Sequence, residues 1–385
     1  MADELAFVLI NPYTIRKSRT GGIIARYIGR TDLRFVAARM IGPSAELAEK
    51  YARLVERADP DHARVRKLLG NYIRREYSPD AQTGRRHRVM LLLFEGENAA
   101  EKIWSITGSA TEGRGSGLTV RDTYGDFVVN EAGAVRYFEP AVLVAPTRER
   151  VGMTLRLWAN YSKNDGGIIA GAGDVPSGEG VEKTLVMLKP DNFKFPSLRA
   201  GNIIDILSAS GLRIVGVKKF TMSMQQAMKF YGPVKSVLAE RFPEIAGHRT
   251  AVALQRELGF EVPEEIVRKM CKELGPLFAE HQFANIVQFI CGKRPGDECS
   301  QPASESCLAV VYEGVDAVRK IRDIIGPTDP SKARPGSVRR EFGSNIMMNA
   351  VHASDSVENA QREIDIIDMQ DDTIHPWMRR YFGRA

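Results

Sequence analysis

A histidine near the C-terminus has a setting suited to phosphate chemistry. His352 follows a predicted apolar strand that ends at Val351, and it precedes Ser354 and Asp355, one of which is expected to open a helix. The start of a helix attracts anions because its first backbone N–H groups point outward. A neutral imidazole there could take up a phosphoryl group, although an isolated histidine is also common as a structural or solvated residue.

Other polar residues of the same half could converge on this histidine. Lys189 ends a predicted strand, and a predicted helix with the long loop after it carries Arg322, Thr328, Arg339 and Asn349. Such side chains can neutralise or bind phosphate oxygens. Lysines and arginines are also often merely solvated, so none of them identifies the chemistry alone.

The predicted elements favour an α+β fold. Strands are expected at 184–189, 212–220 and 307–312, with the last strand ending at Val351; helices are expected at 198–209, at 315–325 and after Ser223. Ser223 followed by Gln226 predicts a capping box. Two helices crossing an antiparallel sheet in a β-α-β-β-α-β path is the ferredoxin-like arrangement.

A diverged internal repeat predicts a second copy of this fold. Ala6–Pro12 echoes Thr184–Pro190, and Glu95–Gly108 echoes Glu313–Gly326 at a constant offset. We expect two ferredoxin-like domains, residues 1–160 and 183–385, joined by a glycine-rich linker at 161–182. The competing interpretation of these glycines as a nucleotide loop lacks support, since no GxGxxG or GxxxxGK[ST] pattern is completed.

Composition narrows the class of protein. The chain has 385 residues, 43% hydrophobic and 26% charged, which is typical of a globular protein with more than one domain. The apolar runs are of strand length and no leader pattern opens the chain, so we expect a cytoplasmic protein without a membrane span. The net charge of +6 is dispersed among acids, which argues against nucleic-acid binding.

The cysteines argue against a metal site. Cys271, Cys291, Cys299 and Cys307 show neither CxxC spacing nor a partnering HxxxH. We expect reduced thiols in the cytosol and no zinc.

Four segments of the second half resemble the nucleoside diphosphate kinase family, in order. They are Lys189-Pro190-Asp191, Gly326-Pro327-Thr328-Asp329-Pro330, Arg334-Pro335-Gly336-Ser337-Val338-Arg339, and Asn349 to Glu358 around His352. The resemblance covers most of residues 183–365. It implies transfer of the γ-phosphate of ATP or another nucleoside triphosphate to a nucleoside diphosphate by a ping-pong mechanism, through a phosphohistidine at His352 and with Mg²⁺.

The resemblance also implies roles for single residues. Arg322, Thr328, Arg339 and Tyr231 would contact the phosphates, Lys189 would reach the ribose hydroxyl and the terminal phosphate, and Asn349 would bind the sugar. Glu363 would accept a hydrogen bond from the imidazole and fix its tautomer, with Ser354 close by. Mg²⁺ would be held by phosphates and water, with Asp355 as an outer contact only.

The second half departs from the family pattern in one large region. About fifty residues separate Tyr231 from Phe283, which predicts an insertion at about 232–282. The base-stacking residue could be Phe283, or Gln282 could take its place, and Met348 stands where an arginine often precedes the asparagine.

The first half lacks the chemistry. Asn11 replaces the lysine, Trp104 replaces the arginine, and Val135–Pro140, where the histidine is expected, contains none. His62 and His87 are interpreted as surface residues. We expect this half to be a degenerate kinase fold that packs against the active half in place of a second subunit. The family's assembly from dimers implies a homo-oligomer, with three chains giving a pseudo-hexamer.

Two other functions fit the same residues. A catalytically weak or dead regulatory protein on this fold would bind nucleotides without transferring phosphate. A basic scaffold would bind polynucleotide or a protein partner in a salt-sensitive way, without any dependence on His352.

Overall fold

The structure, a computed structural model, describes residues 3–57, 62–112, 115–172, 178–296 and 303–383. The chain divides into two compact units, one made of Met1–Phe220 together with Cys307–Ala385 and the other of Thr221–Ser306. Helices and a largely antiparallel sheet are both present, which confirms the expected α+β class.

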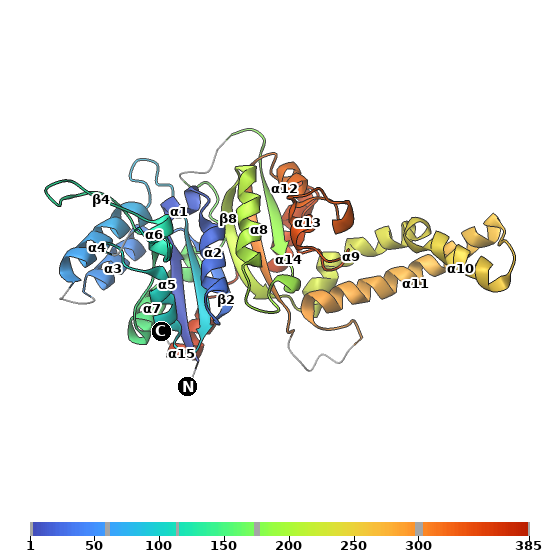
Figure 1. The fold of residues 1–385 in the computed structure, drawn as a ribbon, viewed down its shortest axis with the longest axis horizontal. Helices are drawn as coiled ribbons and strands as arrows, with labels where there is room; N and C mark the ends of the chain where they lie inside the picture. Colours follow the sequence, from blue (N-terminus) through green and yellow to red (C-terminus); the bar gives the residue numbers. More distant parts are fainter. Residues whose placement is uncertain (1–2, 58–61, 113–114, 173–177, 297–302, 384–385) are drawn as a thin grey trace. The chain divides into compact units, whose positions relative to one another are not determined.

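One sheet runs through the larger unit. The described residues give it eight strands in the order β10-β7-β9-β8-β2-β3-β1-β6 (Figure 1). The first half of the chain supplies β1 (Glu4–Ile10), β2 (Arg34–Ile41), β3 (Val89–Gly96) and β6 (Val142–Leu143). The second half supplies β7 (Val181–Leu188), β8 (Arg213–Thr221), β9 (Ser306–Val315) and β10 (Val351–Ala353). Counted outward from the middle of the sheet, each half places its second strand first, then its third, its first and its fourth strand along the chain.

Helices surround the sheet in both halves. In the first half they are α1 (Pro12–Arg16), α2 (Thr20–Gly29), α3 (Ala45–Glu56), α4 (Ala63–Tyr77), α5 (Ala99–Thr107), α6 (Val120–Tyr124) and α7 (Arg148–Asp165), with a separate hairpin of β4 (Asp126–Val129) and β5 (Val135–Glu139). In the second half they are α8 (Arg199–Leu207), α12 (Ala317–Ile325), α13 (Val338–Phe342), α14 (Val357–Ile367) and α15 (His375–Phe382).

The echo in the sequence corresponds to the same local backbone. Gly96 and Gly314 both have φ of 156°, and a Cβ at either would come within 2.8 Å and 2.7 Å, respectively, of a leucine side chain of its own half. Asn98 and Asp316 then adopt the left-handed region before α5 and α12, a conformation that these two residue types tolerate best among non-glycine residues. The two helices therefore begin in the same way.

Two glycines bring α2 and α8 into backbone contact across the middle of the larger unit. A Cβ on Gly21 would lie 2.6 Å from the carbonyl oxygen of Gly201, and a Cβ on Gly201 would lie 2.4 Å from that of Gly21. Figure 1 shows the two helices side by side. A side chain at either position would overlap the backbone of the other helix, so only glycine allows this approach.

The two sets of strands meet where Arg39 of β2 pairs with Lys218 of β8. Both cations are buried, at 1% and 5% exposure. Lys218 Nζ donates to the carbonyls of Ile367 and Asp368, at 3.1 and 2.7 Å, and Arg39 donates to those of Gln370 and Asp371. Burial lowers the pKa of each cation. The carbonyls of Ile367 and Asp368 at the end of α14, and the carboxylate of Asp371, which lies 3.1 Å from Lys218 Nζ, oppose that effect.

The smaller unit is helical. It contains α9 (Met224–Glu240), α10 (His248–Leu258) and α11 (Glu264–Cys291), and α9 packs along α11. Ser223 and Gln226 form the predicted capping box at the start of α9. The unit spans Thr221–Ser306, a wider range than the insertion expected at about 232–282.

The predicted linker and one of the four cysteines lie partly or wholly outside the described residues. α7 continues to Asp165 and β7 begins at Val181, so the described part of the intervening segment is residues 166–172 and 178–180. Cys271, Cys291 and Cys307 are buried and form no disulfide, whereas Cys299 lies outside the described residues.

No helix in the described ranges has both the length and the apolar character needed to cross a membrane.

The α2–α8 contact predicts a stability effect. Gly201→Ala should lower the free energy of unfolding by about 2 kcal/mol, because its methyl group would overlap backbone atoms that cannot move aside. Asn202→Ala, at the next and exposed position of α8, is the matched control and should stay within about 0.5 kcal/mol of wild type. Urea unfolding of both variants measures this, and equal stability of Gly201→Ala, Asn202→Ala and wild type would contradict the packing.

Candidate active site

His352 lies on β10 and is held by a carboxylate from α14. Its Nε2 is 2.8 Å from Oε2 of Glu363, which is 4% exposed. The hydroxyl of Ser354 donates to the same oxygen at 2.6 Å, and Arg362 lies 3.3 Å from the other one. A carboxylate can only accept, so Nε2 carries the proton and the lone pair of the neutral ring is on Nδ1.

The start of α14 differs from the prediction. The strand does not end at Val351 but begins there, and the helix begins at Val357 rather than at Ser354 or Asp355. The physical reason is that Ser354 is fully buried and its hydroxyl is bonded to Glu363, so Ser356 caps the helix by accepting from the N–H of Asn359.

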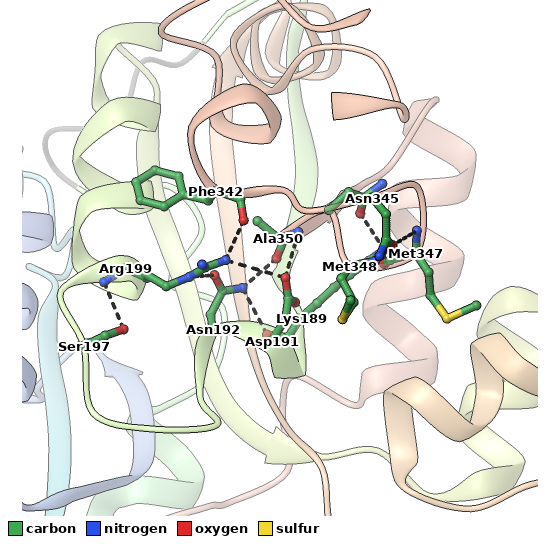
Figure 2. A network of polar contacts seen from close by, with 11 residues as sticks. Lys189, Asp191, Asn192, Ser197, Arg199, Phe342, Asn345, Met347, Met348 and Ala350 are labelled. Atoms are coloured by element: carbon green, nitrogen blue, oxygen red, sulfur yellow. Dashed lines mark hydrogen bonds and ion pairs between the residues drawn. The ribbon is translucent and has the colours of Figure 1, made fainter. Parts of the chain in front are cut away.

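A left-handed alanine sets the path of the chain into β10. Ala350 has φ of 68°, an uncommon conformation for a residue with a Cβ. Its N–H donates to Oδ2 of Asp191 at 3.1 Å, and its carbonyl accepts from the backbone N–H of Lys189 and the side chain of Asn192, at 2.9 and 2.7 Å. Figure 2 shows this network. The three contacts stabilise the strained residue two positions before His352.

Arg199 of α8 completes the network. Its guanidinium donates to the carbonyl of Phe342 at 2.6 Å, lies 3.4 Å from Oδ1 of Asn192 and pairs with Asp191 at 3.7 Å (Figure 2). Burial raises the pKa of Asp191, an effect that Lys189 and the N–H of Ala350 oppose. The loop before β10 is therefore tied to the end of β7 and to α8.

Lys189 and Asn349 contact each other as a pair. Lys189 Nζ donates to Oδ1 of Asn349 at 2.7 Å and to the carbonyl of Met347 at 3.3 Å. Asn349 in turn donates to the carbonyl of Thr328 at 2.9 Å. Burial, aided by the charge of Arg339, lowers the pKa of Lys189 from 10.5 to about 8.

The remaining cations come from α12 and α13. Arg339 donates to the carbonyls of Gly326 and Val351, at 2.8 and 3.2 Å, which ties it to the strand that carries His352. Arg322, in the last turn of α12, and Thr328 are exposed. The larger unit therefore holds His352, Ser354 and Glu363 as one bonded group and Lys189 and Asn349 as another.

Three residues expected at the nucleotide site lie in the helical unit instead of the larger unit that carries His352. Tyr231 is a buried residue of α9, and Phe283 and Gln282 are in α11, all within the helical unit. Oδ1 of Asp355 accepts from Asn359 at 2.7 Å. Among the described side chains, no group of three or more His, Cys, Asp or Glu is arranged to hold a metal ion.

Three contributors were missed by sequence reasoning. Asn192 and Arg199 follow the quoted Lys-Pro-Asp segment, but a polar residue after a strand gives no sign of what it will bind. The conformation of Ala350 has no sequence signal, because alanine is not a residue type that favours positive φ.

The first half has a corresponding place without these side chains. The backbone N–H of Asn11 donates to the carbonyl of Ala141, which has φ of 60°, as that of Lys189 does to Ala350. Leu143 then faces Leu9 in the register in which His352 faces Met187. The position corresponding to His352 is therefore Leu143, and the expected stretch Val135–Pro140 was wrong, because those residues form β5 and the turn after it.

Comparisons with known proteins bear on the second half. The family model described as nucleoside diphosphate kinase matches residues 182–255 and 296–372. The nucleoside diphosphate kinases of Nitratiruptor sp. and Campylobacter jejuni subsp. jejuni serotype O:6 are 30% and 31% identical to the chain over 184 and 185 residues, which is 48% of this chain and 93% of each relative. The crystal structure of the Aquifex aeolicus nucleoside diphosphate kinase aligns at 30% identity with a TM-score of 0.31, covering 49% of this chain and 94% of that one.

The low pKa of Lys189 predicts a pH effect on anion binding. Its folded pKa of about 8 lies below the unfolded value, so burial costs stability below pH 8 and the cost disappears as pH rises toward 10.5. The positive charge is present below pH 8 and lost above it. Affinity for ADP should thus fall about tenfold between pH 7 and pH 9 if only the charged lysine binds phosphate.

Isothermal titration at several pH values measures this effect. Lys189→Arg is the matched control, because a guanidinium stays charged throughout the range and should remove the inflection near pH 8. An inflection of the same size in Lys189→Arg would show that another group titrates.

Proposed function

The chain belongs to the nucleoside diphosphate kinase family, and on that premise we propose that its second half transfers the γ-phosphate of a nucleoside triphosphate to a nucleoside diphosphate through His352. The observation that carries the proposal is the hydrogen bond between Nε2 of His352 and Glu363. It assigns the lone pair to Nδ1 and gives the imidazole the tautomer that a nucleophile needs.

The reaction has two half-steps. The lone pair on Nδ1 attacks the γ-phosphorus, the bond from this phosphorus to the β–γ bridging oxygen breaks, and the nucleoside diphosphate leaves with that electron pair. The phosphohistidine carries the positive charge of the ring, which the carboxylate of Glu363 stabilises through the Nε2 proton. In the second half-step, a terminal phosphate oxygen of another diphosphate attacks the same phosphorus and the bond to Nδ1 breaks.

Positive charge around the phosphates supplies the catalysis, since phosphoryl transfer depends on positioning and charge neutralisation. Lys189, Arg322 and Arg339 contribute it, and Thr328 adds a hydroxyl donor. Asn349, already bonded to Lys189, would bind the sugar, and Ser354 supports Glu363. Mg²⁺ bound to the phosphates would draw charge from the leaving group, with Asp355 as an outer contact.

The wider assignment follows the family. The substrates are ATP and other nucleoside tri- and diphosphates without strong base preference, and the setting is the cytoplasm. Neither a membrane nor a nucleic acid takes part.

Formation of a phosphoenzyme tests the proposal. Incubation with γ-labelled ATP and Mg²⁺ should give an acid-labile, base-stable label that passes to any added diphosphate. His352→Ala should lose both steps. Glu363→Gln should slow labelling roughly a hundredfold, because a neutral amide no longer stabilises the charged ring.

The matched control is Glu358→Gln, an exposed residue in the first turn of the same helix, which should label at the wild-type rate. Nucleotide binding without labelling of the wild type would favour the dead regulatory protein instead. Labelling that persists in His352→Ala would place the nucleophile elsewhere.

We also propose that the first half takes the place of a second subunit. The shared sheet, the Gly21–Gly201 contact and the Arg39–Lys218 pair support this. Such a fused pair would behave as one dimer, so that three chains would form a pseudo-hexamer.

Separation of the halves tests this second proposal. A fragment beginning at residue 183 would expose the edge of β8 and the face of α8 that packs on α2, so it should aggregate or lose most of the phosphotransfer rate. Size-exclusion chromatography with light scattering and the labelling assay measure this. A soluble, assembled and fully active fragment would refute the idea.

A further inference from the structure

The first half contains a pocket at the place that corresponds to the site of His352. Its volume is about 490 Å³, within the range of small-molecule sites. α3, α4, α5 and α7 contribute to its wall, together with Leu143. Leu143 occupies the position equivalent to His352, so the pocket has no nucleophile there.

The pocket keeps one arginine of the site in the second half. Arg121 donates to the carbonyls of Gly108 and Val142, at 3.0 and 3.2 Å, as Arg339 does to those of Gly326 and Val351. Arg121 is 3% exposed and its guanidinium carbon lies 5.9 Å from the ring centre of Trp104. A fixed positive charge therefore lines the pocket next to an aromatic ring that is 40% exposed.

The end corresponding to Lys189 is closed to a polyphosphate. Asn11 stands there, with its amide donating to Glu139 at 3.2 Å. The hydroxyl of Tyr72 and the N–H of Ala141 also donate to this carboxylate. The hydroxyl of Tyr77 donates to the side-chain oxygen of Asn11. Asn11 and Glu139 are both buried, so side chains and an acidic group fill the place where phosphate oxygens would be needed.

The open part of the pocket combines an apolar wall with positive charge. Tyr51, Leu54 and Val55 of α3 with Val65 and Leu69 of α4 form that wall. Arg66, Arg150 and His62 also line the pocket, against one acidic residue, Glu112. An apolar body would bury carbon surface against the wall, while an anionic group would be attracted by the arginines.

We propose that this pocket binds a small organic anion, a molecule with an aromatic or aliphatic body and one oxyanion head group. The body lies between Trp104 and the wall from α3 and α4, and the head group faces Arg121 and Arg150. The proposal does not depend on phosphotransfer at His352.

Two fluorescent probes with the same body test it. The full-length protein, with ADP and Mg²⁺ present to occupy the other site, is titrated with 1-anilinonaphthalene-8-sulfonate and with uncharged N-phenyl-1-naphthylamine. The sulfonate should bind at least about fivefold more tightly, because the arginines attract only its head group. Binding should also change the emission of Trp104, and that change should be absent in Trp104→Phe.

Charge variants on α7 separate the pocket from the surface around it. Arg150→Glu should weaken the sulfonate roughly tenfold and leave the neutral probe within about twofold. Arg148→Glu, exposed in the same helical turn but outside the pocket, is the matched control and should bind both probes as wild type does. Ser105→Trp, which adds bulk from an exposed position on α5, should block both probes without unfolding the chain.

Other outcomes overturn the proposal. Equal binding of the sulfonate by wild type, Arg150→Glu and Ser105→Trp would show that the pocket is not the site. Displacement of the sulfonate by ATP from the wild-type protein would show a nucleotide site instead. Near-ultraviolet circular dichroism of each variant confirms that the fold is retained.

Discussion

The arrangement of the larger unit depends on two buried like charges at the centre of its sheet. Arg39 and Lys218 face each other where the strands of the two halves meet, so each needs acceptors that bury with it. The segment that supplies most of them, residues 367–371, begins at the last residue of α14. Because α14 also carries Glu363, the junction between the halves fixes the helix that orients His352. Loss of either cation would remove the hydrogen bonds that tie its strand to this segment and free that part of the chain.

A second constraint acts from the opposite side of His352. Ala350 keeps an unfavourable φ because Asp191, Asn192 and the backbone of Lys189 bind its two peptide groups. The same backbone arrangement recurs at Ala141 in the first half, although no histidine follows it. The strained turn is therefore a feature of the fold in both halves, and the chemistry of each half depends on the side chains that follow the turn. Those side chains form the proposed phosphate site in one half and an apolar pocket with arginines in the other.

Part of this could be predicted from the sequence. The constant offset between Glu95–Gly108 and Glu313–Gly326 predicts two helices with the same start, because glycine and Asn or Asp mark the backbone there. The contact between His352 and Glu363 was expected only from the resemblance to the kinase family. Pairings over long range could not be predicted. Arg199 contacts Phe342, and Arg39 binds residues far along the chain, with no local pattern to mark either contact. The start of α14 was missed because Ser354 and Ser356 are equally good caps, and only burial separates them.

The central claim is that Glu363 holds Nε2 of His352 and thereby reserves Nδ1 for the phosphoryl group. The position of the phosphate on the ring tests this most directly. Phosphorus and nitrogen NMR of the phosphoenzyme, prepared from ATP with histidine labelled in its ring nitrogens, distinguishes the two isomers. The account predicts a phosphorus–nitrogen coupling to Nδ1 and a protonated Nε2. A phosphate on Nε2, or on the oxygen of Ser354, would contradict it.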